Sequence, residues 1–187
     1  MTSNMSSSGF TVNVILGLDP GIQPTQLFDQ LNIIFYTLNM NLTLYSIVSF
    51  CIILIFSIVL SLQDIKKMTV GIYIQWLSIF AALSCHLIFN RQEMWIYILS
   101  SMIIGCFYFA VRKITKNKLG PADVWFGFFQ GLFLTPILIP ICLAIESIAA
   151  LIIINKKFGK ERFPFIPFMS LGLIASYIIG LTNIIKF

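Results

Sequence analysis

Charged residues are scarce in this chain. Only 10% of its 187 residues are Asp, Glu, Lys or Arg, whereas a soluble domain normally carries about 25%. Hydrophobic residues make up 58% of the sequence, and phenylalanine alone occurs 18 times. This composition excludes an ordinary soluble domain. It predicts an integral membrane protein, an all-α polytopic bundle of about six transmembrane helices with no room for a second sizeable domain.

Histidine and paired cysteines are also lacking. The single histidine, His86, lies near the outer end of an apolar run; Cys85 precedes it, but no acidic residue is adjacent. The four cysteines each fall alone within an apolar run, and none forms a C-x-x-C pair: Cys51, Cys85, Cys106 and Cys142. A zinc module or a disulfide framework is therefore not expected. We predict a protein that needs no metal and no organic cofactor.

The apolar runs have the length of helices that cross a bilayer, about 20 residues or slightly fewer. Six are expected, at roughly 44–62, 70–89, 94–111, 122–135, 137–154 and 168–185. Pro136 and Pro140 separate the fourth run from the fifth, because proline breaks a helix interior. The fourth run is short for a complete crossing.

Residues 1–39 differ from the rest of the chain. They contain no Lys or Arg and lack the basic region that opens a secretory signal. We expect an N-terminal extension, ordered or disordered, or a stretch added by the choice of start site, since Met40 directly precedes the first strong run. Residues 40–187 are expected to form the membrane-embedded functional domain.

The basic residues are divided between the apolar runs instead of gathering on one face. Ten of the 12 follow the first, third and fifth runs, beginning with Lys66 and Lys67. These loops share one side if all six runs cross, and the positive-inside rule makes that side cytoplasmic. The net charge of +5 is thus a topology signal, and no nucleic-acid partner is expected.

Two acidic residues lie where apolar runs meet these basic clusters. Asp64 ends the first run and Asp123 begins the fourth, so both are predicted at the cytoplasmic surface. A carboxylate at a membrane edge is costly and is often functional. Two close carboxylates that share one proton provide an acid and a base in one site. Each residue also has a structural interpretation. Asp64 is then an interfacial residue whose charge is neutralised by the neighbouring lysines, and Asp123 caps the start of a helix.

Three segments resemble the type IV prepilin peptidase and preflagellin peptidase family, the GxGD-type membrane aspartyl proteases. The first is Asp64-Ile-Lys66-Lys67-Met-Thr-Val, which is similar to the family's first aspartate motif. The second is Gly120-Pro121-Ala122-Asp123, which is similar to its Gly-x-Gly-Asp motif. The third is Phe-Pro164-Phe-Ile-Pro167-Phe, which is similar to the segment that opens the last span. The likeness runs from about Leu44 to the C-terminus.

The resemblance implies an aspartyl endopeptidase of the inner membrane with a cytoplasmic active site. Its dyad would be Asp64 and Asp123, and its substrate the basic leader of a prepilin-like or pseudopilin precursor. Supporting positions would be Gly120, Pro121, Ala122, Lys66, Lys67, Pro164 and Pro167. The chain departs from the family pattern at Ala122, where the family has glycine, and at Trp125, where it often has a basic residue. It also lacks a cysteine-rich N-methylation domain.

Other interpretations remain open at this stage. A non-catalytic transporter or assembly subunit would be expected to place polar residues near the bilayer midplane. An intramembrane aspartyl protease with a different substrate is the second alternative. Glu146 lies inside the fifth run and either tunes the dyad or, as we expect, is protonated and hydrogen-bonded across helices. The sequence does not decide which aspartate is the acid, nor the oligomeric state.

Overall fold

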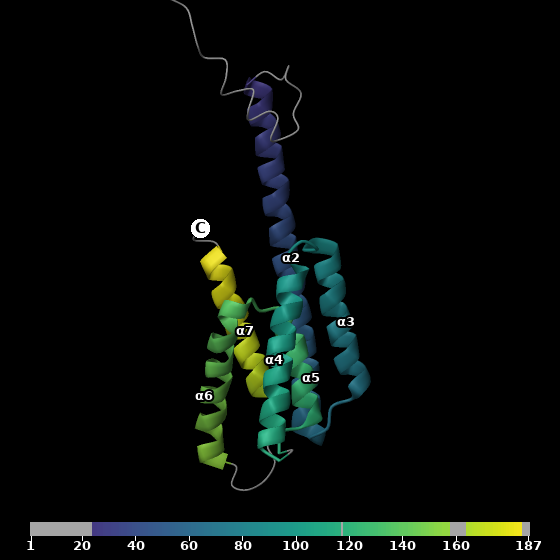
Figure 1. Ribbon diagram of the computed structural model, residues 1–187, viewed down its shortest axis with the longest axis vertical. Coiled ribbons are helices and arrows are strands. Elements are labelled where there is room, and N and C mark those ends of the chain that lie inside the picture. Colours follow the sequence, from purple (N-terminus) through teal and green to yellow (C-terminus); the bar gives the residue numbers. More distant parts are fainter. Residues whose placement is uncertain (1–23, 117, 158–163, 185–187) are drawn as a thin grey trace, which may run out of the picture. The chain divides into compact units, whose positions relative to one another are not determined.

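The computed structural model describes residues 24–116, 118–157 and 164–184, and these residues are helical or lie in short connections (Figure 1). The helices are α2 (Pro24–Lys67), α3 (Ile72–Phe89), α4 (Met94–Ile114), α5 (Pro121–Gly131), the short 3-10 helix η1 (Pro136–Leu138), α6 (Ile139–Lys157) and α7 (Ile166–Ile184). The predicted all-α class is confirmed.

The chain forms two compact units that divide between Thr43 and Leu44. In the first unit the described residues are the beginning of α2, which already includes residues 24–39 of the predicted N-terminal extension. Residues 1–23 of that extension lie outside the described part. The second unit contains the rest of α2 and all later helices, and with them every predicted site residue.

Three helical segments within the described residues are long and apolar enough to cross a membrane: Leu42–Lys67, Ile72–Phe89 and Met94–Ile114. Two further apolar helical stretches, Pro136–Ile152 and Ile166–Thr182, are shorter. They coincide with the predicted fifth and sixth runs, so the chain is a membrane protein with apolar helices at all the predicted positions.

The fourth helix is shorter than its predicted range, 122–135. Helix α5 has 11 residues, which gives a rise of about 16 Å and about half of the hydrocarbon thickness. It ends at Gly131, and a turn leads to Pro136. The proline ring clashes with the carbonyl four residues earlier, so a helix that reached residue 135 could not continue. Helix α5 is therefore a half-span, not a complete crossing.

The interior of the second unit contains polar side chains as well as an apolar core. The buried polar residues come from every α-helix, and they include Ser49, Ser57, Gln75, Ser78, His86, Ser100, Gln130, Glu146 and Ser176. Large apolar side chains on the same helices are exposed, among them Ile47, Ile55, Ile58, Leu77, Phe80, Leu99 and Ile148. This distribution suits a molecule whose outer medium is lipid, because a polar group there has no hydrogen-bond partner.

Helix α5 is the core of the second unit. It contacts α3, α4 and α7, and its Phe126 and Phe129 are fully buried. The Phe129 ring also meets Phe56 of α2 edge to face, with centroids 6.0 Å apart. A short helix surrounded by longer ones has a fixed position, and so does the aspartate in its first turn.

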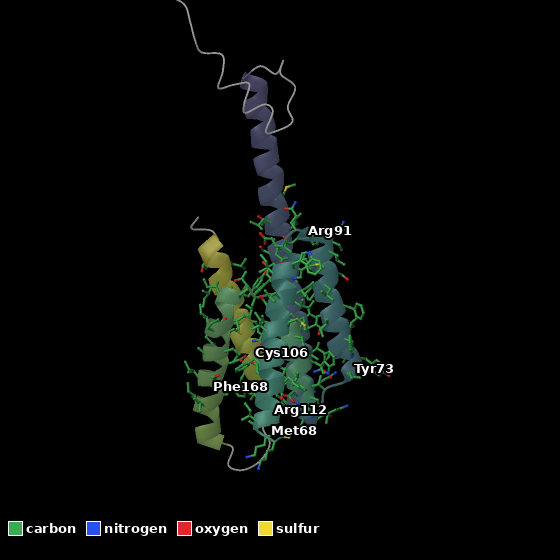
Figure 2. All side chains as sticks on the ribbon, viewed as in Figure 1. Met68, Tyr73, Arg91, Cys106, Arg112 and Phe168 are labelled. Carbon is green, nitrogen blue, oxygen red and sulfur yellow. The ribbon has the colours of Figure 1, made fainter. Side chains whose placement is uncertain are left out.

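The described basic residues lie at both ends of the bundle, with more of them at one end than at the other. Figure 2 shows Met68, just after α2, and Arg112, near the end of α4, at the same end of the bundle, with Arg91 at the opposite end. Lys66, Lys67 and Lys113 are exposed at the first of these ends. The third predicted basic loop, around residues 156–162, lies outside the described side chains.

Two glycines allow α5 to approach α4 closely. A Cβ added at Gly127 would overlap the ring of Tyr108. A Cβ added at Gly131 would lie 2.6 Å from the backbone nitrogen of Ser101 and 2.7 Å from the carbonyl oxygen of Ser100. Backbone atoms cannot move aside as a flexible side chain can, so Gly131 sets the distance between the two helices.

We predict that Gly131→Ala destabilises the bundle by about 2–3 kcal/mol or more, because the added methyl group must displace the backbone of α4. Thermal unfolding in detergent measures the effect. The matched control is Gly71→Ala, where the added Cβ would meet only Gln63 Oε1 at 3.9 Å and the cost should stay below about 1 kcal/mol. Equal melting temperatures for the two variants would contradict the packing described here.

Candidate active site

Asp64 occupies the last turn of α2, and its side chain turns into the bundle. The helix stops directly after it: the Met68 N–H donates to the Asp64 carbonyl at 2.9 Å, and Met68 adopts a left-handed φ of 49°. The Asp64 side chain is only 7% exposed. Its Oδ2 accepts a hydrogen bond of 3.1 Å from the Ile166 N–H, which opens α7. Asp64 thus caps a helix that lies 102 residues away in sequence.

Asp123 is in the first turn of α5. Pro121 takes the first helical position, where no backbone N–H is needed. Asp123 Oδ2 accepts from the Gly120 N–H at 2.9 Å, which is the reciprocal half of a capping box. The prediction that Asp123 caps the start of a helix is therefore confirmed. A Cβ at position 120 would lie 3.1 Å from the same oxygen, so glycine leaves room for the carboxylate.

The segment before Asp123 is held from a third helix. Gln75 of α3 is buried, and its Nε2 donates to the Ala122 carbonyl at 2.8 Å. This bond fixes the residue next to Asp123 at the start of α5.

The two carboxylates interact although they lie 59 positions apart. Asp123 is outside the three spanning segments and, like Asp64, is only 7% exposed. Burial raises the pKa of Asp123, the negative charge of Asp64 raises it further, and the Gly120 hydrogen bond opposes both, which leaves a pKa of about 7. A carboxyl group with this pKa is largely protonated below neutral pH while its neighbour carries a charge.

The lysines of the first motif do not neutralise this pair. Lys66 and Lys67 are exposed, and no cation is among the groups that shift the pKa of Asp123. Within the described part of the chain, neither carboxylate has an ion-pair partner within 4.0 Å. The site therefore keeps the repulsion that favours a shared proton.

The third sequence motif meets the first one. Pro164 precedes α7, and Pro167 is the second residue of that helix, where proline is tolerated. Between them, Ile166 donates its N–H to Asp64. Prolines on both sides restrict the backbone that presents this donor. The contact gives a physical role to a motif that the sequence could identify only by resemblance.

Glu146 lies apart from the two aspartates, in the interior of the bundle. It is 1% exposed. Tyr108 of α4 donates its hydroxyl to Glu146 Oε1, and Gln130 of α5 donates Nε2 to Oε2 at 3.1 Å. The predicted hydrogen bonding across helices is confirmed. Glu146 is not among the groups whose charge acts on Asp123.

The structure adds three residues that sequence reasoning did not place at the site: Gln75, Tyr108 and Gln130. Each is a hydrogen-bonding side chain within an apolar helix, and each is buried. Lone polar groups in such runs are costly unless they are paired. The cost of an unpaired polar group indicates that each of these side chains has a hydrogen-bond partner. It does not indicate which residue that partner is, and in all three cases the partner lies on another helix.

His86 has a packing role. Its Nε2 donates to the Leu132 carbonyl just beyond the end of α5, and its Nδ1 accepts from the Tyr45 hydroxyl at 3.3 Å. It thereby pairs a carbonyl left free where the half-span stops. Among the described residues no three His, Cys, Asp or Glu side chains gather to hold a metal ion.

We predict that Asp64→Ala speeds hydrogen exchange in the first turn of α7 about five-fold, because the Ile166 N–H loses its acceptor and a cap is worth about 1 kcal/mol. Asp64→Asn should leave exchange nearly unchanged, since the amide oxygen still accepts. Hydrogen exchange of the peptide around residues 164–169, read by mass spectrometry, measures this.

The control for this experiment is Ser61→Ala. It removes the 3.0 Å hydrogen bond between Ser61 and Ser170, which joins the same two helices one turn away from Asp64. Exchange at Ile166 should not respond to it. Wild-type exchange in the Asp64→Ala variant would show that the carboxylate does not hold α7.

Comparison with protein-family models, with curated proteins and with solved structures gave no match. The functional interpretation therefore depends on the chain's own residues and on their geometry.

Proposed function

We propose that this protein is an aspartyl endopeptidase of the cell inner membrane that removes the basic leader of prepilin-like precursors at the cytoplasmic face. One observation carries the proposal. Two buried aspartates come from different helices; burial raises the pKa of Asp123, and Asp64 lies close enough for its negative charge to raise that pKa further, to about 7. Neither is neutralised by a cation among the described residues. An acid and a base in one site are what hydrolysis of a peptide bond requires.

The protonation states suggest a division of labour. Ionised Asp64 takes a proton from a water molecule as the water oxygen attacks the scissile carbonyl carbon. Protonated Asp123 donates to the carbonyl oxygen, giving a tetrahedral intermediate. Collapse of this intermediate breaks the C–N bond, and the proton now on Asp64 passes to the leaving amine. The carbonyl re-forms and returns its proton to Asp123, so the pair ends with one proton, as it began.

The position of the site supports the substrate class that the resemblance implies. Both aspartates are in the end turns of their helices, at the end of the bundle where Lys66 and Lys67 are exposed. A precursor with a short polar leader and an apolar helix would place their junction at this depth. Its apolar helix would lie beside the exposed isoleucine and leucine side chains of the bundle.

The competing interpretation with a specific observation behind it is a structural one. Both carboxylates accept backbone hydrogen bonds at helix N-termini, and a non-catalytic membrane subunit would use them in the same way. Capping alone does not explain why two buried acids are brought together, because their repulsion opposes folding when both are ionised. Asparagine can cap but cannot transfer the proton, so it separates the two interpretations.

We predict that Asp64→Asn and Asp123→Asn each lower leader cleavage by at least about 10²–10⁴-fold, the contribution of one acid or base, while the protein stays folded. Co-expression with a prepilin-like precursor from the same genome, followed by gel separation of precursor and product, measures this. The control is Glu93→Gln, an exposed acid that is hydrogen-bonded to Asn90. Normal cleavage by either Asn variant would exclude the dyad.

We also predict that cleavage declines as the pH rises through about 7. Below this value Asp123 is protonated and can donate; above it Asp123 ionises, and the site holds two bases and no acid. Initial rates of purified protein between about pH 5 and 9 test the sign. A rate that increases steadily over that whole range would contradict the assignment of Asp123 as the acid.

A further inference from the structure

Tyr108 of α4 connects the two halves of the site. Its hydroxyl donates to Glu146 of α6, and its ring meets Phe165 edge to face, with centroids 6.4 Å apart and planes at 70°. Its ring also fills the space that a Cβ at Gly127 would occupy. The side chain is 2% exposed, so these contacts hold it on all sides.

Two of these contacts, those with Phe165 and Gly127, lead to the aspartates. Phe165 directly precedes Ile166, whose N–H holds Asp64. Gly127 lies one helical turn after Asp123 on α5. Tyr108 is also close enough to both Asp123 and Glu146 for their charges to act on it. One side chain thus touches the segment that supports the first aspartate and the helix that carries the second.

Glu146 anchors the tyrosine. Both of its oxygens accept hydrogen bonds, one from Tyr108 and the other from Gln130. Gln130 is itself on α5, and its Nε2 also approaches the Met169 carbonyl of α7 at 3.4 Å. The carboxyl group therefore joins α4, α5 and α6 deep in the bundle, where a lost hydrogen bond cannot be replaced by water.

We propose that Tyr108 is a positioning residue for the aspartyl dyad and that Glu146 acts through it. The hydroxyl fixes where the ring lies, and the ring fixes the separation between the first turn of α7 and the first turns of α5. The separation of the two carboxylates follows from these two positions. This inference rests on the proposed peptidase function and adds to it a residue that touches neither the substrate nor the water.

The test uses the full chain and a precursor from the same genome that carries a basic leader and an apolar helix. Tyr108→Phe keeps the ring but removes its anchor, and we expect kcat to fall about ten- to a hundred-fold, the effect of a small misplacement. KM should stay within about two-fold, because the surface that meets the substrate helix is unchanged. Tyr97→Phe is the matched control: it lies on the same helix, against His86, and should keep wild-type kcat.

A conservative change at position 146 provides the rescue. Glu146→Gln can still accept from Tyr108, and Gln130 Oε1, which has no partner, becomes available to accept from the new amide. We expect Glu146→Gln to retain most of kcat and Glu146→Leu to lose as much as Tyr108→Phe. The double variant Tyr108→Phe/Glu146→Leu should lose no more than either alone, since the two residues act as a unit.

The outcomes separate the two claims. If the wild type does not cleave the precursor, the proposed function falls and this inference falls with it. If the wild type cleaves and Tyr108→Phe keeps its kcat, only the inference is overturned. Equal losses in Tyr97→Phe and Tyr108→Phe, or strictly multiplicative losses in the double variant, would also overturn it, because they would indicate a general loss of packing.

Discussion

The central constraint in this protein is the cost of two buried carboxyl groups at one end of a helical bundle. Each has one oxygen fixed by a backbone N–H at the start of a helix: Asp123 by the residue that precedes its own helix, and Asp64 by the first residue of α7. These bonds hold the carboxylates in place without a cation. A lysine or arginine in the same position would lower the energy of both charges and remove the reason for a shared proton.

The rest of the bundle serves to bring these two helix starts together. Helix α5 is short, and it is buried against α3, α4 and α7. Its position is set on one side by glycines that admit α4 and on the other by Gln75, which holds the Ala122 carbonyl. Polar side chains, which cost free energy when they are exposed to lipid, form hydrogen bonds between helices. The surface that remains is rich in large apolar side chains, which suits the bilayer.

Much of this could be predicted from the sequence, and the failures have physical reasons. Run length and composition predicted the helix class and positions, because the solvent is uniform lipid and hydropathy reports it directly. The position of Pro136 predicts that the fourth helix stops before it, but not that the helix already ends at Gly131, because the proline ring excludes the helical carbonyl four residues earlier. The partners of Asp64 and Glu146 could not be predicted, since periodicity does not say which helices become neighbours. The roles of the motif residues remain proposals.

The bond that holds Asp64 has a consequence for how the protein matures. Its acceptor is at the end of α2, and its donor is supplied by α7, 102 residues later in the chain. During synthesis the early helices enter the bilayer before this donor exists, so the first aspartate cannot take its final orientation until α7 has inserted and docked. The last of the described helices thus completes the arrangement of the two aspartates, and an incompletely inserted molecule would contain both acids without that arrangement.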